Sequence, residues 1–358
     1  MIYLLSLAMV VWLMGFADER TALKQNNYKY YMIIAGTLVA LVMGLRTKYT
    51  GSTDTIMYVS FFQGQVNYDS FFDYYDQHLA DTEFIFSETG FYLFTWLLSR
   101  ITQEEQMLVL VTSAFVIFSA CRFIYKNTQD PPTGLLVYVC LGLFTFNMNG
   151  MRQAMAMSIC MLGYELVKKR KLLWFLLVVF IAMQFHKTAF CFVIVYFFPL
   201  LKEGKANIFW YLVGMVVFLL SVNVLVESFN AFTGEDYDIT AQADGGGITV
   251  IFIYAACILL GLIMYDSLKK RELRTAYLGV VAGFACYITR FFSTAILERL
   301  SYYFFYFTLL LIPNLINELE EQERKVVKIL FGFFAVILLW YRVRNGAFSN
   351  FKLFYYYR

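Results

Sequence analysis

The sequence predicts an all-α, polytopic integral membrane protein, a helical bundle of about 12 transmembrane helices with one additional re-entrant or surface helix. Composition is the first reason: 60% of the 358 residues are hydrophobic and 15% are charged, with a mean hydropathy of +0.61. Soluble globular domains are less apolar and more charged. The second reason is pattern, because apolar runs of about 15 to 20 residues recur between short polar clusters, as in proteins that cross a bilayer several times.

The predicted helices follow one another along the whole chain, which we expect to be a single transmembrane domain, residues 1–358. With roughly 20 residues for each crossing, they fall at 2–16, 30–47, 107–125, 133–149, 151–167, 172–185, 188–201, 207–226, 248–267, 275–290, 297–316 and 326–343. The first run lacks a preceding basic region and a small-residue cleavage pattern, which predicts a retained helix. All six cysteines lie in or beside apolar runs without metal-type spacing and are expected to be packing residues.

The basic residues predict the orientation of these helices. One choice of orientation places 18 of the 29 basic residues in cytoplasmic loops, as the positive-inside rule requires. These loops include Lys168 to Lys171, which separate the apolar runs 151–167 and 172–185. Arg152 and His186, at the far ends of those two runs, are therefore expected to share the outer face of the membrane.

Three segments do not fit a simple crossing. Residues 84–100 are apolar enough to enter the bilayer, yet a full crossing there would invert every later loop, so a re-entrant or surface-lying helix is favoured over a miscounted neighbour. Residues 47–100 as a whole are predicted to be an outer-face loop with amphipathic or re-entrant helices, since aromatic and acidic residues alternate in it. Residues 227–247 form an acidic outer loop ending in three glycines, which favours a flexible hinge over a phosphate cradle.

Several ionisable residues gather on the predicted outer face. An ionisable group within a span costs about 2.5 to 3.5 kcal/mol on insertion scales, so each is a functional candidate; the alternative is an arginine that reaches from a helix end to the lipid headgroups. The candidates are Arg46, Asp54, Glu88, Arg152, His186, Arg290 and Arg299.

Arg152 is the strongest candidate for binding an anion. Asn149 and Gln153 crowd hydrogen-bonding groups around it at the start of a predicted helix, where backbone N–H groups and a guanidinium together favour negative charge. Arg290 and Arg299 flank a turn between two helices and can add positive charge. The planar fork of arginine suits a diphosphate better than the point charge of lysine.

The candidate general base remains open among three residues. His186 stands at the outer end of a short helix, level with the arginines, although a lone histidine there can also be a packing residue. Asp54 and Glu88 are the alternatives, but Asp54 can serve as a helix cap and Glu88 as the partner of an arginine. We find no nucleotide-binding, hydrolase-elbow, zinc or D-x-D motif, so neither a metal nor another cofactor is predicted.

Five short motifs occur in order along the chain. They are G-L-R-x-x-Y-x-G-x-D-T-x-x-Y (Gly44 to Tyr58), S-E-x-G-F (Ser87 to Phe91), N-x-x-R-Q-A-x-A (Asn149 to Ala156), F-H-K-T-A (Phe185 to Ala189) and E-R-L-S-Y-Y (Glu298 to Tyr303). Each motif is weak alone, but together they span most of the chain. The sequence resembles the EpsG family of Wzy-like polysaccharide polymerases.

The resemblance implies a metal-independent glycosyltransferase of GT-C-like architecture in the bacterial inner (plasma) membrane. Such enzymes join oligosaccharide repeat units carried on undecaprenyl diphosphate at the periplasmic face, during assembly of the O-antigen of lipopolysaccharide, of capsule or of exopolysaccharide, with arginines on the diphosphate. The implied partners are the lipid-linked donor and acceptor, membrane lipid and a chain-length regulator, and no nucleic acid. Inversion at the anomeric carbon is expected. The alternatives are a transporter or flippase of the lipid-linked oligosaccharide, which predicts charges along a pore, and an O-antigen ligase, which differs in its acceptor.

Overall fold

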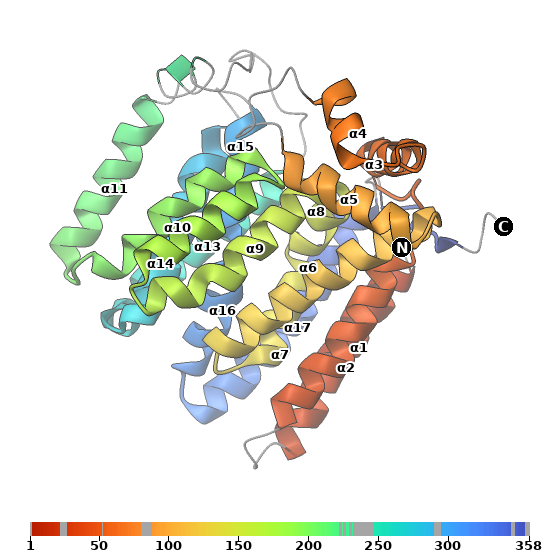
Figure 1. The fold of residues 1–358 in the computed structure, drawn as a ribbon. Helices are drawn as coiled ribbons and strands as arrows, with labels where there is room; N and C mark the ends of the chain where they lie inside the picture. Colours follow the sequence, from red (N-terminus) through yellow and green to blue (C-terminus); the bar gives the residue numbers. More distant parts are fainter. Residues whose placement is uncertain are drawn as a thin grey trace. The chain divides into compact units, whose positions relative to one another are not determined.

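The computed structural model describes residues 2–21, 27–51, 53–79, 88–221, 224, 227–228, 231, 247–289, 295–344 and 348–354. The chain forms two compact units, residues 1–190 with 325–358 and residues 191–324, and each is described by itself. The described residues are almost entirely helical (Figure 1), and an isolated bridge between Arg46 and Leu353 is the β-type pairing found among them. The all-α prediction is confirmed, whereas the single transmembrane domain stays a prediction.

Most described helices of the first unit follow the predicted apolar runs. They are α1 (Ile2–Thr21), α2 (Asn27–Gly44), α6 (Glu105–Asn127), α7 (Pro131–Cys140), α8 (Leu143–Asn149), α9 (Met151–Lys168), α10 (Leu172–Met183) and α17 (Glu321–Arg344). Helix α6 packs against both α2 and α9, and α10 packs against α9. Five of the six cysteines in the chain are buried, as expected for packing residues.

Contacts at the two ends of α6 show which helix termini lie together in this unit. At its first turn, the Gln106 side chain donates to the carbonyl of Gly44 at 2.6 Å, so α6 begins where α2 ends. At its other end, the rings of Phe123 and Tyr164 lie 5.4 Å apart, so α6 and α9 run in the same direction. The basic turn that follows α9 is therefore at the end of the unit opposite to Arg152, as the charge pattern predicts.

The predicted continuous helix at 133–149 is wrong in one respect: it is two helices, α7 and α8, bent by 53° relative to each other. Gly142 at the break has a φ of +131°, which is open to glycine and strained for other residues. The break exposes the carbonyl of Leu141, which accepts a hydrogen bond from the Arg342 guanidinium of α17. The Arg342 side chain thus satisfies the Leu141 carbonyl, which the bend leaves without a partner in its own helix.

Three short helices cover one end of the first unit. They are α3 (Thr53–Gln65), α4 (Phe71–His78) and α5 (Thr89–Ile101). Ser70 caps α4 by accepting from the backbone N–H of Phe72 at 3.1 Å. Helix α5 has 13 residues and a length of about 20 Å, too short to cross a hydrocarbon core of about 30 Å. Its re-entrant or surface position stays a prediction.

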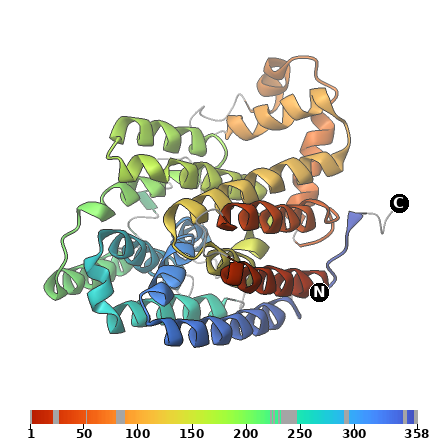
Figure 2. The same ribbon diagram turned by 90° about the horizontal axis from the view of Figure 1, so that it is seen from below.

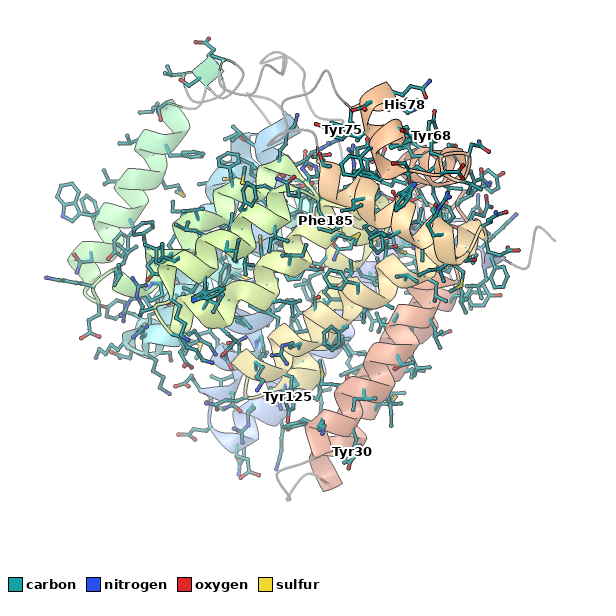
Figure 3. All side chains as sticks on the ribbon, viewed as in Figure 1. Tyr30, Tyr68, Tyr75, His78, Tyr125 and Phe185 are labelled. Carbon is teal, nitrogen blue, oxygen red and sulfur yellow. The ribbon has the colours of Figure 1, made fainter. Side chains whose placement is uncertain are left out.

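Aromatic side chains occur at both ends of the first unit. Figure 3 shows Tyr68 and His78 beside α4 at one end and Tyr30 and Tyr125 at the other. Tyrosine is enriched where a membrane protein meets the two headgroup layers. The pattern fits a unit whose long helices run from one interface to the other.

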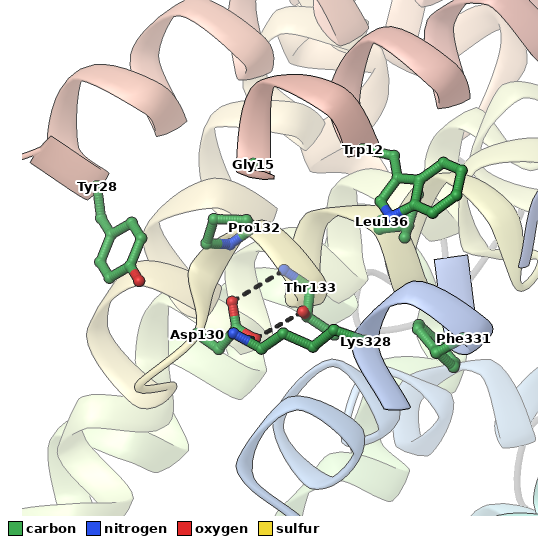
Figure 4. A pocket seen from close by; sticks show the side chains of 9 residues that line it. All are labelled: Trp12, Gly15, Tyr28, Asp130, Pro132, Thr133, Leu136, Lys328 and Phe331. Atoms are coloured by element: carbon green, nitrogen blue, oxygen red, sulfur yellow. Dashed lines mark hydrogen bonds and ion pairs between the residues drawn. The ribbon is translucent and has the colours of Figure 1, made fainter. Parts of the chain in front are cut away.

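A buried ion pair lies near the end of the first unit that holds Tyr30 and Tyr125. Asp130 caps the start of α7 and accepts from the hydroxyl of Thr133 at 2.6 Å, and Lys328 of α17 lies 2.9 Å from the same carboxylate (Figure 4). The group borders a cavity of about 30 Å³, which is room for about one water molecule. Trp12 packs on Gly332 nearby, and Figure 2 shows α1 running beside α17.

The second unit contains 3₁₀ and α-helices. The segment η1 (Lys187–Tyr196) begins in the first unit and is followed by η2 (Phe198–Leu200), α11 (Lys205–Leu220), α13 (Ile248–Ile263), η3 (Tyr265–Lys269), α14 (Arg271–Ile288), α15 (Ala295–Phe305) and α16 (Thr308–Asn317). Helix α14 packs on α13 and α15. The predicted helix at 188–201 is wound as 3₁₀ turns; at about 2.0 Å per residue, such turns cover more distance than an α-helix of equal length. The acidic loop 227–247 lies mostly outside the described residues.

Apolar exposure identifies the protein as a membrane protein. Three helices are long and apolar enough to cross a bilayer, or four if the bent α7–α8 pair is one span, within the described residues. On α17, the side chains of Leu330, Phe333, Phe334 and Ile337 are each more than half exposed. A soluble protein does not present such a continuous apolar face, whereas lipid covers it at no cost. The total of about 12 crossings stays a prediction.

Candidate functional site

The candidate site is centred on the carboxylate of Glu88. The residue is buried, with 6% of its surface exposed, and its φ of 52° puts it in the left-handed region immediately before α5. Its Oε2 pairs with Nη1 of Arg152, and its Oε1 accepts from the backbone N–H of Lys187 at 3.1 Å. Nδ1 of His186 lies 3.3 Å from Oε1. One carboxylate therefore joins the start of α9 to the turn that follows α10.

Arg152 and His186 meet at this carboxylate, as their positions in the sequence predict. Arg152 is the second residue of α9, and His186 follows the last residue of α10 by three positions. Because α9 and α10 pack side by side, the two residues come to the same end of the helix pair. The Arg152 side chain is 23% exposed and that of His186 is 12% exposed, so both lie at a partly covered surface.

Aromatic rings flank the Arg152 guanidinium. Its Cζ lies 5.4 Å from the centre of the Tyr58 ring, within the range of a cation–π interaction. Burial raises the pKa of the Tyr58 hydroxyl, and the charge and hydrogen bond of Arg152 oppose that rise. The Nε of Arg152 has no hydrogen-bond partner within the described part of the chain. The guanidinium thus keeps donor capacity after pairing with Glu88.

The His186 imidazole is held by its neighbours through Nδ1. Besides Glu88, the hydroxyl of Thr188 lies 3.1 Å from this nitrogen and the backbone N–H of Thr188 lies 3.4 Å from it. The Thr188 N–H donates to Nδ1, whereas the Glu88 carboxylate favours a proton on that nitrogen, so these two neighbours favour different tautomers. A general base at Nε2 requires the tautomer with its proton on Nδ1.

Arg46 takes a different place from the one expected of a residue that touches a substrate. It is 1% exposed, and its guanidinium donates to the carbonyls of Met43 at 2.5 Å and Met148 at 2.7 Å. Thr55 donates to the same Met148 carbonyl at 3.3 Å. Arg46 therefore holds the end of α8 at Met148, which lies four residues before Arg152. Its predicted contact with a diphosphate stays a prediction.

The other predicted residues near Arg152 lie around the same junction. Gln153 is buried at 3% exposure, and Asn149 is the last residue of α8. An added Cβ on Gly51, whose φ is +105°, would collide with the Asn149 side chain, so only glycine lets the two segments approach so closely. Asp54 lies in the first turn of α3, half-buried, and its charge acts on Tyr58. The site thus gathers three of the predicted diphosphate-binding residues and all three candidate bases.

The predicted roles of the two remaining arginines stay predictions. Arg290 lies outside the described residues, and Arg299 is an exposed residue of α15 in the second unit. Among the described residues no group of three potential metal ligands occurs.

Two residues that the sequence analysis did not single out join the site. Tyr58 lies four positions after Asp54, which puts both on one face of α3; this spacing was a usable signal. Tyr92 follows Glu88 by the same interval, and the charges of Arg152 and Glu88 both act on its hydroxyl. The backbone N–H of Lys187 could not be found from residue types, because every residue but proline has one.

Four of the five sequence motifs converge here. The segments 44–58, 87–91, 149–156 and 185–189 are remote in sequence, yet contacts through Tyr58, Glu88 and Arg152 join them within the first unit. The model of the EpsG family matches residues 29–357. The chain belongs to the EpsG family. No curated protein and no solved structure shows significant similarity to it.

Membership of the EpsG family supports a role in polysaccharide assembly at a membrane by a glycosyltransferase or polymerase. The fifth motif, Glu298 to Tyr303, belongs to α15 of the second unit. Glu88, Arg152 and His186 are called the Glu88 group below. In this EpsG-family chain, the group combines an arginine with remaining donor capacity, an imidazole held by its neighbours and a fixed carboxylate. Such a set can bind an anionic leaving group and accept a proton.

Proposed function

We propose that the protein is a polymerase that joins oligosaccharide repeat units carried on undecaprenyl diphosphate. The observation that carries the proposal is the meeting of Arg152, Glu88 and His186 at one end of the first unit, in a chain of the EpsG family. We place this end at the outer face of the bacterial inner membrane, because the basic turn Lys168 to Lys171 occupies the other end.

In the proposed reaction an acceptor hydroxyl attacks the anomeric carbon of the donor from the side opposite the diphosphate. A new C–O bond forms as the bond between the anomeric carbon and the diphosphate oxygen breaks. The hydroxyl proton passes to Nε2 of His186, and undecaprenyl diphosphate leaves with the bonding electron pair. Attack from the opposite side inverts the configuration at the anomeric carbon.

Arg152 would stabilise the charge that develops on the leaving diphosphate. Such a contact strengthens in the transition state, where low polarity around the site makes each charge more effective. A diphosphate carries more negative charge than one guanidinium neutralises, and we assign the additional positive charge to Arg290 and Arg299. Glu88 would orient both Arg152 and the imidazole, and Asp54 is the alternative base.

The test uses single replacements in the cell that makes the polymer. Arg152→Ala and His186→Ala should leave single repeat units on the lipid carrier and abolish the long polymer, because one oxyanion-type contact contributes about 10²- to 10³-fold and a general base about 10²- to 10⁴-fold. Arg122→Ala is the matched control, since this arginine is exposed near the other end of α6. Normal chain length in the Arg152 and His186 variants, at normal protein levels, would refute the assignment.

A further inference from the structure

A cavity of about 740 Å³ lies among α3, α4 and α5, next to the Glu88 group. Aromatic rings form much of its lining: Phe61 of α3, Tyr74 of α4 and Tyr92 of α5, with Tyr68 between α3 and α4. A concave site of about 300 to 1,000 Å³ with aromatic walls and a few polar groups is typical of small-molecule binding. Nothing in the proposed glycosyl transfer uses this space.

The rings hold one another in fixed orientations. The ring centres of Tyr68 and Tyr74 lie 5.3 Å apart in an edge-to-face arrangement, and those of Tyr74 and Tyr92 lie 6.2 Å apart. The Tyr68 hydroxyl donates to the Gln77 side chain at 2.6 Å and lies 2.9 Å from Nε2 of His78. Figure 3 shows Tyr68 and His78 near each other at this end of the unit. Preorganised rings bind a ligand without the cost of ordering them.

The residues around the cavity argue against a purely apolar ligand and against an anionic one. Asn67 and His78 add hydrogen-bonding groups to the aromatic walls, which a hydrocarbon chain would leave unsatisfied. No lysine or arginine lines the cavity among the described residues, and the nearby α3–α4 segment carries the exposed carboxylates Asp69, Asp73 and Asp76. These charges repel phosphate.

Neutral carbohydrate fits this combination. A sugar ring has a C–H face that packs on an aromatic ring and hydroxyl groups around its edge that pair with amide, imidazole and phenol groups. The Tyr74 hydroxyl is uncharged at neutral pH, as any tyrosine is, and burial raises its pKa further, to about 12. The volume suits an oligosaccharide of roughly two or three sugar rings.

We propose that this cavity is a carbohydrate subsite that holds the sugar part of a lipid-linked substrate while its diphosphate end lies at Arg152. Tyr92 links the cavity to the Glu88 group, because it lines the cavity and the charges of Arg152 and Glu88 act on its hydroxyl. The subsite rests on the proposed function for its role, but its ligand class is argued from the cavity alone.

Gly64 offers a direct test. It lies in α3, lines the cavity, and has open space around the position of an added Cβ. Its φ is not in the left-handed region, so a larger residue is compatible with the backbone. Gly64→Trp should therefore fill the cavity without moving the protein around it. Gly214 of α11 also has open space at its Cβ position and lies in the second unit, so Gly214→Trp is the matched control.

The probe is the reducing oligosaccharide released by mild acid from the host's own lipid-linked repeat unit, with binding to the detergent-solubilised full chain followed by saturation-transfer NMR and calorimetry. We expect wild type, Gly64→Ala and Gly214→Trp to bind it, and Gly64→Trp to bind at least tenfold more weakly with an unchanged thermal midpoint. Phe61→Leu, which removes one aromatic face, should also weaken binding about tenfold. Equal binding by all variants, or no binding by wild type, would overturn the subsite.

Two further measurements separate the subsite from the proposed function. Inorganic pyrophosphate should not compete with the oligosaccharide, and competition by polyprenyl phosphate that is lost in Gly64→Trp would show that the cavity takes lipid instead. Binding that depends on Gly64 in a protein that fails to polymerise would keep the subsite and reject the polymerase. A Gly64→Trp variant that polymerises with unchanged KM would reject the subsite and keep the polymerase.

Discussion

Replacing Glu88 by glutamine removes a charge and changes little in volume, so it isolates the electrostatic role of the carboxylate. The wild-type carboxylate pairs with Arg152, accepts from the Lys187 backbone and faces the His186 imidazole. Leaving one charge of a buried pair without its partner costs about 3 to 5 kcal/mol. The Arg152 side chain is 23% exposed, and water compensates part of this loss, which gives about 2 to 3 kcal/mol.

The assay is the thermal midpoint of the purified protein in detergent. At about 2 °C for each kcal/mol in a large domain, Glu88→Gln should lower the midpoint by about 5 °C. The double variant with Arg152→Gln should lie closer to wild type than the sum of the two single losses, because the removed interaction is shared. Glu105→Gln is the control, since its pair with Lys48 is partly exposed and contributes about 0.2 to 1 kcal/mol. An unchanged midpoint for Glu88→Gln, or strict additivity in the double variant, would refute the pairing.

Four further expectations concern single features. Arg46→Met should abolish polymer and lower the thermal midpoint, because the hydrogen bonds that join α2, α6 and α8 through the Met43 carbonyl, the Ser113 hydroxyl and the Met148 carbonyl disappear; normal polymer would contradict its positioning role. Gly142→Ala should destabilise by about 1 to 3 kcal/mol, measured by the same midpoint, since its φ is +131°. Asp130→Asn should lower the midpoint and leave the turnover of the surviving protein unchanged, because it strands the Lys328 charge far from Arg152. The pKa of Tyr74 is raised from about 10 to about 12, so above pH 10 the unfolded chain loses this proton first; stability should fall with a smaller slope between pH 10 and 12 in Tyr74→Phe than in wild type.

The sequence alone was enough to predict the helices and the proximity of Arg152 and His186. Each predicted apolar run contains a helix in the described residues, because hydrophobic length alone sets where a chain can cross lipid. The basic turn between α9 and α10 indicated that Arg152 and His186 lie at the same end of the two helices. Because the basic turn marks one end of both helices, the far ends that carry these two residues had to lie together.

Features that depend on backbone angles and tertiary contacts could not be predicted. The carboxylate of Glu88 reaches three groups because its φ is 52°, and no residue pattern states that angle. The bend at Gly142 is compensated by Arg342, which lies 200 positions later in the sequence. Arg46 was expected to face a substrate, and its hydrogen bond to the Met148 carbonyl at 2.7 Å could not be foreseen from the sequence. Its fully buried position is a consequence of packing.

The cavity beside α4 illustrates the same limit. The alternation of aromatic and acidic residues predicted a surface helix, and α4 lies where the pattern indicated. Whether Tyr74 and Tyr92 face lipid or each other depends on the angle between α4 and α5, which is set by hydrogen bonds such as that from Trp96 to the Tyr68 carbonyl at 3.1 Å. Only the three-dimensional arrangement brings these aromatic residues together around an open cavity.

The measurement that tests the account most directly is reconstitution of the purified protein in vesicles with the host's lipid-linked repeat unit and no ion gradient. The account predicts a ladder of multiples of the repeat on the lipid carrier with wild type and with Arg122→Ala, and single units with Arg152→Ala. Movement of unchanged single units across the vesicle membrane, without any ladder, would contradict it and identify a transporter.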